Sequence, residues 1–137
     1  MQSSVAREMQ RKFLYADKCI YHCDGQGAFQ QIIHIADKDD LIIMISLSGD
    51  SEHTVSSAKQ IKSKNIPLIA ITKLKVNQLA RLADESIYAG TSVISDSFQD
   101  QYETSVLFFI LTEILLVKYM IYKETLERLT DLQILDN

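Results

Sequence analysis

Tryptophan is absent from this chain of 137 residues, and proline, cysteine and glycine occur only once, twice and four times. So little proline and glycine excludes long structureless linkers, and no internal repeat is visible. In a strand the two cysteines, Cys19 and Cys23, would lie about 13 Å apart, which is too far for a disulfide. The first residues also lack the apolar segment of a secretory signal. We therefore expect a compact cytoplasmic protein without disulfides.

Positive charge is also scarce, since 14 Lys and Arg residues stand against 18 Asp and Glu residues and leave a net charge of −4. Binding to nucleic acid requires a basic face, so this chain is not expected to bind DNA on its own.

The longest apolar stretch, residues 106–122, contains Glu113 and Lys118. Both are costly inside a bilayer, and we therefore expect a buried helix and no membrane contact.

Apolar spacing and turn residues predict alternating helices and strands. The segments at 41–45 (LIIMI) and 68–71 (LIAI) are wholly apolar, which indicates strands covered on both faces. This order predicts an α/β fold, a three-layer sandwich with a mainly parallel sheet between helices. The expected helices are 3–14, 28–36, 52–64, 76–83 and 101–129, and the expected strands are 19–23, 41–45, 68–71 and 85–89.

A loop with the sequence SLSGDS, residues 46–51 and here called the serine loop, follows the strand at 41–45 and precedes a helix. Ligands of parallel sheets bind at the carboxyl ends of strands. Gly49 lets the backbone approach a ligand, and the N–H groups of a helix N-terminus attract phosphate. Ser46, Ser48 and Ser51 can donate hydroxyl bonds to it. The alternative is a polar turn in which Asp50 or Ser51 only caps the helix.

The stretch of residues 40–87 resembles the sugar isomerase (SIS) family of phosphosugar-binding domains. The resemblance is carried by the motif S-x-S-G-x-S at residues 46–51, Ile71-Thr72 at the end of a strand, and LARLAD at residues 79–84. The long apolar helix after Asp100 is further similar to the RpiR-type transcription regulators. In those proteins a helix-turn-helix domain reads DNA and an SIS domain senses a phosphosugar.

The resemblance implies one SIS domain over residues 1–137, with a core at about 3–90 and a helical segment at about 101–129. The family's first strand and its glycine-rich loop would lie before Ser3, so we expect a sheet of four strands without that first strand. The helix-turn-helix domain is missing as well. Lys73 stands where the family often has a polar amide, and we expect it to point to solvent. The resemblance implies a sugar phosphate held by Ser46, Leu47, Ser48, Gly49 and Ser51, with Ser3 or Ser4 (or, with a slip of one, Gln2) on the other side.

Some SIS domains isomerise aldose and ketose phosphates, a reaction that needs a positioned general base. Each candidate here has an equally good structural role, and none is singled out as catalytic: Glu52, His53, His22, His34, Glu103 and Glu113. We therefore expect the phosphosugar-binding effector domain of an RpiR-like regulator of carbohydrate metabolism, without cofactor or metal. The alternative is an aldose–ketose phosphate isomerase. The sequence Gly25-Gln26-Gly27 lacks the third glycine of a dinucleotide-binding motif, so we expect a turn there. A flavin-binding loop usually follows the first strand, whereas the serine loop follows a later one, so flavin is a weaker alternative.

The helix expected at 101–129 is apolar nearly all the way round between residues 106 and 122. One sheet face cannot cover such a helix, so we expect a homodimer interface there. Glu113 is expected to pair across that interface. Contact with DNA would come only through the missing helix-turn-helix domain.

Overall fold

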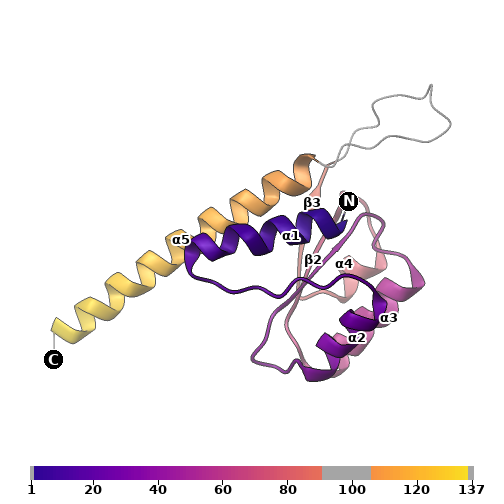
Figure 1. The fold of residues 1–137 in the computed structure, drawn as a ribbon, viewed down its shortest axis with the longest axis horizontal. Helices are drawn as coiled ribbons and strands as arrows, with labels where there is room; N and C mark the ends of the chain where they lie inside the picture. The colour runs from indigo at the N-terminus through magenta and orange to yellow at the C-terminus, as the bar shows by residue number, and fades with distance from the viewer. Residues whose placement is uncertain (1, 91–105, 136–137) are drawn as a thin grey trace.

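The computed structural model describes residues 2–90 and 106–135 (Figure 1). Helices and strands alternate along the chain, and the sheet lies between two layers of helices, so the predicted fold class is confirmed. The elements are α1 Gln2–Phe13, the short 3-10 helix η1 Leu14–Ala16, α2 Gln26–Ile35, β1 Ile42–Ser46, α3 Glu52–Ser63, β2 Leu68–Lys73, α4 Gln78–Leu82, β3 Glu85–Ala89 and α5 Val106–Leu135.

The three described strands are parallel and lie in the order β1-β2-β3. Ser46 lies opposite Thr72, and Lys73 lies opposite Ala89. The three strands therefore end side by side, and we call this end of the sheet the carboxyl edge. Each parallel connection needs a crossover, which α3 and α4 provide.

Successive residues of a strand face opposite sides, so each apolar strand serves two cores. One core lies under α2, α3 and α4, and the other under α1 and α5, as the two helical layers in Figure 1 indicate. The first core contains Ile33, Ile42, Met44, Ala58, Ile61, Leu68, Ala70 and Leu79. The second contains Val5, Met9, Phe13, Ile71, Phe108 and Leu116, with Ile43, Ile45 and Leu47 packed against them.

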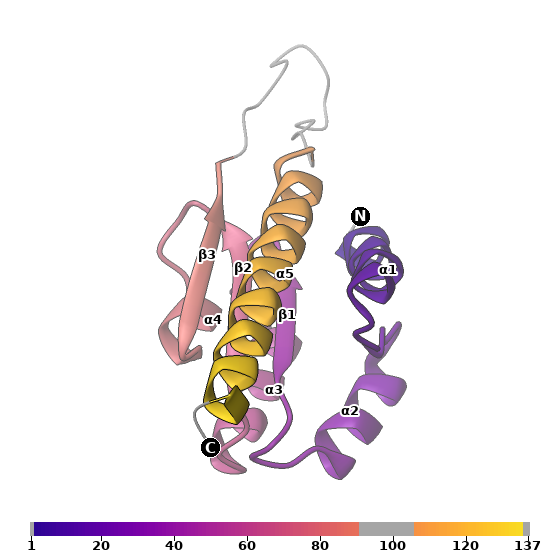
Figure 2. The same ribbon diagram turned by 90° about the vertical axis from the view of Figure 1, so that its left-hand side faces the viewer.

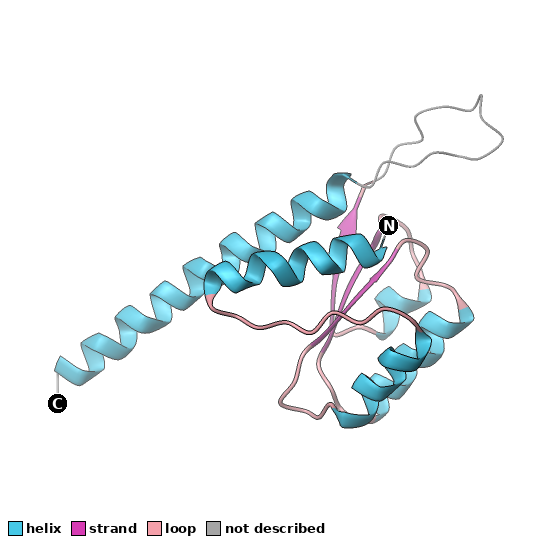
Figure 3. Cartoon of the chain, in the orientation of Figure 1, coloured by secondary structure: helices cyan, strands magenta, loops and turns pink. Residues whose placement is uncertain are grey.

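The strand predicted at residues 19–23 is wrong, and the described part of the sheet has three strands in place of four. A strand exists only when a neighbour completes its hydrogen bonds, and within residues 2–90 and 106–135 β1 pairs only with β2. The segment instead runs beside α1 as a loop (Figure 3). It is held there by a hydrogen bond from Gln10 Nε2 to the Ile20 carbonyl, 2.9 Å long. Cys19 and Cys23 are both free thiols.

The other predicted elements differ from the observed ones at their ends. Helix α4 is shorter than predicted because Asn77 caps it, and α5 continues to Leu135. Residues 101–105 of the predicted terminal helix lie outside the described residues. Helix α5 has 30 residues, about 45 Å, and its C-terminal half projects past the sheet (Figure 1). None of the described helices combines the length and the apolar character that a bilayer span requires.

Candidate functional site at the carboxyl edge

The serine loop lies at the carboxyl edge, between the end of β1 and the start of α3. Both views also place the N-terminus of α1 at this edge, on the other face of the sheet (Figures 1 and 2). The structure thus brings the two predicted groups of serines, residues 46–51 and residues 3–4, to the same end of the sheet.

The bend of the serine loop depends on Ser46 and Gly49. Gly49 has a φ of +67°, which is the left-handed region that favours glycine. The side chain of Ser46 is buried, and its Oγ accepts a hydrogen bond of 3.1 Å from the Gly49 N–H. A Cβ at residue 49 would lie only 2.1 Å from Oδ1 of Asn77. Ser46 therefore shapes the loop from inside, and residue 49 must be glycine.

Asn77 packs against the serine loop at Gly49 and holds it in place. Its amide is almost fully buried, and Nδ2 donates to Thr72 Oγ1 at 3.0 Å and to the Lys75 carbonyl at 2.9 Å. Its Oδ1 accepts from the Ala80 N–H at 2.8 Å and so caps α4. Sequence reasoning missed Asn77, and it named Thr72 only as part of a family motif, without a role in the site. The available signal was an asparagine directly before a short predicted helix.

Two further hydrogen bonds fasten the serine loop to α4. The Leu79 N–H donates to the Gly49 carbonyl at 2.9 Å, and the Gln78 N–H donates to Asp50 Oδ1 at 2.9 Å. Asp50 therefore orders the loop and does not cap α3. The loops after β1 and β2 form one hydrogen-bonded unit.

The cap of α3 is Ser51, whose Oγ accepts from the Thr54 N–H at 3.3 Å and donates to Thr54 Oγ1 at 2.6 Å. Ser48 is exposed, and its Oγ accepts only a long hydrogen bond of 3.4 Å from the Asp50 N–H. The N–H groups of Glu52 and His53 have no hydrogen-bond acceptor in the part of the chain that the structure describes. The exposed face of the loop thus offers hydroxyl and amide donors beside the positive end of a helix.

Ser3 is engaged away from the serine loop. Its Oγ lies 3.4 Å from Nε2 of His22. A hydrogen bond from Ser3 is the main cause that lowers the pKa of the Asp24 carboxyl, with His22 and Arg7 adding to the effect. Ser4 in the same turn is exposed. The cluster of Ser3, His22 and Asp24 fixes the first turn of α1 to the segment before α2.

The residues considered as general bases are scattered over the structure. Glu52 and His53 lie in the first turn of α3, and His53 meets the edge of the Phe29 ring at a centroid distance of 6.5 Å. Glu113 forms an ion pair with Lys12 of α1 in the same chain. Glu103 lies outside the described residues. Only Glu52 and His53 belong to the turn that follows the serine loop.

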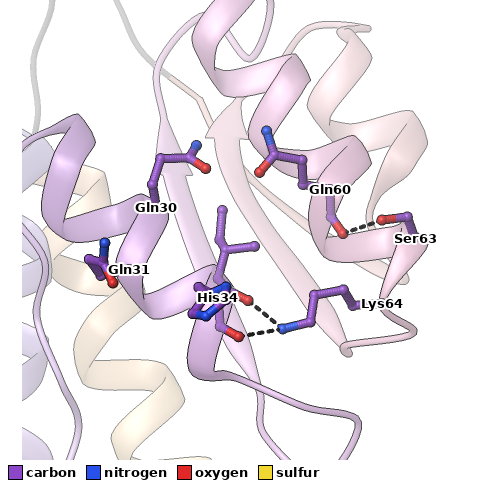
Figure 4. Close-up of a pocket in the computed structure, with 7 residues that line it drawn as sticks. Gln30, Gln31, His34, Gln60, Ser63 and Lys64 are labelled. Atoms are coloured by element: carbon purple, nitrogen blue, oxygen red, sulfur yellow. Dashed lines mark hydrogen bonds between the residues drawn. The ribbon is translucent and has the colours of Figure 1, made fainter.

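An open hollow of about 590 Å³ lies between α2 and the C-terminal end of α3 (Figure 4). His34 lines it, and so does Lys64, whose Nζ donates to the carbonyls of Ile33, His34 and Ala36 at 2.6, 2.9 and 2.7 Å. Because the ammonium already binds three carbonyls and the hollow lies at the far end of α3 from the serine loop, it is a surface depression and not the predicted site.

A parallel three-layer sandwich with a serine- and glycine-rich loop at its carboxyl edge defines an SIS-type α/β domain. The model of the SIS domain family matches residues 1–111, and the chain belongs to that family. The regulator GlvR of Bacillus subtilis is 32% identical over 123 residues, which are 90% of this chain and 48% of that protein. The chain therefore spans about half the length of this relative.

Isomerising enzymes are also among the relatives. A glutamine–fructose-6-phosphate aminotransferase of Clostridium tetani is 35% identical over 74 residues, 53% of this chain and 12% of the enzyme. Two solved structures share the fold. The sugar isomerase domain of an RpiR transcription factor from Sphaerobacter thermophilus has a TM-score of 0.71 at 20% identity. The match covers 98% of this chain and 72% of that domain's chain. NanR of Vibrio vulnificus, in complex with ManNAc-6P, has a TM-score of 0.72 at 17% identity. The match covers 96% of this chain and 51% of the NanR chain.

Proposed function

We propose that this chain is the phosphosugar-binding effector domain of an RpiR-like transcriptional regulator of carbohydrate metabolism. The observation that carries the proposal is the prebuilt serine loop, whose exposed donors face solvent beside the N-terminus of α3. The similarity to GlvR over 90% of the chain and the sugar-phosphate complex of NanR, a protein of the same fold, support it. Since sugar phosphates are products of intracellular metabolism, we place the regulator in the cytoplasm.

In this proposal the phosphate group lies on the serine loop. Ser48 donates its hydroxyl, Ser51 adds a second one at the helix start, and the backbone at Leu47 and Gly49 borders the phosphate. Ser46 contributes through the shape that it gives to the loop. Ser4, or Ser3 after release from His22, closes the other side from α1. The whole of residues 1–137 is then one SIS domain, with its core at about 3–90.

The domain is proposed to sense its ligand and not to convert it. Glu52 and His53 are the only acid–base candidates in the turn after the loop, and both sit where a helix start commonly holds such residues. Ligand binding would then act by favouring one arrangement of a homodimer over another, which changes the DNA affinity of an attached helix-turn-helix domain. The exposed apolar side chains of α5 supply the dimer interface in this proposal.

A panel of sugar phosphates, each beside its unphosphorylated sugar, tests the proposal by thermal denaturation. A ligand at 100 times its dissociation constant stabilises a protein by about 2.7 kcal/mol, which raises the melting temperature measurably. We expect a rise with phosphorylated members only, and its loss in Ser48→Ala. Ser56→Ala, an exposed serine of α3, is the matched control and should respond like the wild type. No rise with any phosphorylated sugar would contradict the proposal.

The alternative, an aldose–ketose phosphate isomerase, is favoured by the similarity to the isomerising aminotransferase. Incubation of the chain with each sugar phosphate that binds, followed by NMR of the sugar, separates the two functions. Turnover that disappears in Glu52→Gln or His53→Gln would establish the enzyme. Binding without turnover is the result that we expect.

A further inference from the structure

Helix α1 meets a different part of the molecule at each of its ends. Its first turn, with Ser3 and Ser4, lies at the carboxyl edge, where the proposed ligand binds (Figure 2). Its C-terminal turn packs against α5, in the core that contains Phe13 and Leu116 (Figure 1). The 12 residues of α1 rise by about 18 Å. The helix therefore spans the distance between the proposed site and the helix whose apolar side chains are exposed.

The N-terminal end of α1 is attached by bonds that a ligand can exchange. A hydrogen bond from Ser3 lowers the pKa of the Asp24 carboxyl, and Arg7 Nη2 lies 3.3 Å from Asp24 Oδ2. The side chains of Arg7 and Asp24 are 71% and 53% exposed, and exposed ion pairs are weak. A serine hydroxyl has only one hydrogen to donate. Ser3 can therefore donate to Asp24 or to a phosphate oxygen, and not to both.

The C-terminal end of α1 is attached through a largely buried charge. The side chain of Lys12 is 19% exposed, and its Nζ forms an ion pair with Glu113 of α5. The same Nζ lies 3.6 Å from Oε1 of Glu8. Removing a carboxylate from a largely buried ammonium is costly, so this contact is firm. The ring of Phe13 also packs against that of Tyr119, at a centroid distance of 5.5 Å. We therefore expect the last turn of α1 and the first half of α5 to move together.

The free half of α5 starts where these attachments end. Directly after α1, the Ala16 carbonyl accepts a hydrogen bond of 3.2 Å from Lys123 Nζ, which also lies 3.6 Å from Asp17 Oδ2. Residues 124–135 are all exposed. The direction in which α5 leaves the sheet thus depends on the end of α1 and on η1, the short helix that follows it.

We propose that α1 transmits ligand binding at the carboxyl edge to α5, with Ser3 as the contact that changes partner and the Lys12–Glu113 ion pair as the contact that is kept. This inference rests on the proposed function and adds to it the element through which the ligand regulates. When a phosphate takes the Ser3 hydroxyl, the first turn of α1 is released from residues 22–24, the helix shifts, and α5 changes direction with it. Lys12 and Glu113 are positioning residues, because neither contacts the ligand. By linkage, anything that binds to α5 in one of its two directions changes the affinity for the ligand by the same factor.

Hydrogen–deuterium exchange of the full chain, measured by mass spectrometry, tests the inference. The probes are glucose 6-phosphate, arabinose 5-phosphate and N-acetylmannosamine 6-phosphate, each at a concentration that saturates the chain in calorimetry. In the wild type we expect a bound probe to change the exchange rates of residues 117–135 by at least about twofold. Glu113→Gln should bind the probe with an affinity within about threefold of the wild type and should lose at least about half of that change. Glu127→Gln removes an exposed carboxylate of the same helix, and as the matched control it should keep the change.

A second variant tests the N-terminal contact without any ligand. Asp24→Ala removes the acceptor of Ser3 and the partner of Arg7. We expect it to shift the exchange of residues 117–135 in the absence of probe toward that of the bound wild type. An Asp24→Ala chain that exchanges like the unbound wild type would overturn the inference.

Melting temperatures establish that the variants fold, and Lys12→Met replaces Glu113→Gln if that variant does not. A bound wild type with unchanged exchange in α5 would overturn the inference and leave the proposed function standing. The full wild-type change in Glu113→Gln, or an equal loss in Glu127→Gln, would overturn it as well. So would loss of probe binding in both Glu113→Gln and Lys12→Met, because the ion pair would then be needed for the site itself. A wild-type chain that binds none of the probes would overturn the proposed function, and this inference with it.

Discussion

Gly49 stands where the loops after β1 and β2 touch. Its positive φ disfavours any L side chain by about 1–2 kcal/mol, and the amide of Asn77 occupies the place of a Cβ. We expect Gly49→Ala to lower the free energy of unfolding by at least about 2 kcal/mol, as measured by urea denaturation. Gly27→Ala is the matched control, because a Cβ there would meet nothing within 4 Å and the residue lies in a helix. A wild-type midpoint in Gly49→Ala would contradict the observed loop.

Asp84 joins the starts of β2 and β3. Its Oδ2 accepts from the Leu68 N–H at 2.8 Å, and Oδ1 pairs with Lys62. The bond with Lys62, followed by that with Leu68, holds the pKa of this carboxyl below its ordinary value of 3.8. A lowered pKa in the folded state stabilises the protein above the unfolded-state pKa, and this contribution disappears as the pH falls through the folded pKa.

We therefore expect Asp84→Asn to be less stable than the wild type at pH 7. The difference in urea midpoint should shrink as the pH is lowered below about 4 and vanish below the folded pKa. Asp131→Asn on the exposed side of α5 should show no such dependence. A difference between Asp84→Asn and wild type that stays constant with pH would exclude the ion pair as its cause.

Sequence reasoning found the residues of the serine loop but not how they are used. The spacing of serines around one glycine predicts a loop that can bind an anion, because that pattern is local. Whether Ser46 faces a ligand or the interior depends on the direction of the last β1 residue. That Asn77 supports Gly49 depends on the register of β1 against β2. Both are properties of the assembled sheet, and no local pattern contains them.

The C-terminal end of α2 is capped by the side chain of Lys64, the residue that follows α3. Its ammonium meets three carbonyls at the negative end of the helix, where cations stabilise. We expect Lys64→Met to lower the free energy of unfolding by about 1 kcal/mol at low salt, and by less at high salt. Lys59→Met, another exposed lysine of α3, should leave the urea midpoint unchanged. Equal effects of the two substitutions would show that Lys64 does not act through α2.

At the level of elements, the sequence predicts best what is decided within one segment. The continuous apolar runs of β1 and β2 and the amphipathic spacing of α1 and α3 each predict their element within one or two residues. The segment at 19–23 has the composition of a strand but no paired neighbour, and pairing is decided by other parts of the chain. The extent of α5 beyond residue 129 was underestimated because exposed leucines continue there without a break signal.

The molecule is elongated on one side, because the C-terminal half of α5 extends beyond the sheet (Figure 1). Apolar side chains are exposed to solvent along this helix. Leu126, Leu129 and Leu132 follow one another at intervals of three residues, and they are 50%, 55% and 59% exposed. An apolar surface of this kind is typical of an interface between chains. We expect a two-fold homodimer held by α5.

Light scattering at micromolar concentration checks this expectation. The wild type should have the mass of a dimer, and the double substitution Leu129→Lys with Leu132→Lys should have the mass of a monomer. Thr130→Lys adds charge to an exposed position of the same turn and is expected to remain dimeric. A wild-type monomer would exclude the α5 interface.

The close approach of Gly49 to Asn77 also restricts how the sequence can change over evolutionary time. A side chain at residue 49 has no room while an amide occupies residue 77, and a smaller residue at 77 leaves Thr72 and the start of α4 without their partner. A change at either position alone is therefore expected to lower the stability of the fold. Two residues 28 positions apart are therefore inherited as a pair, and descendants of this loop are expected to keep both or to exchange both together.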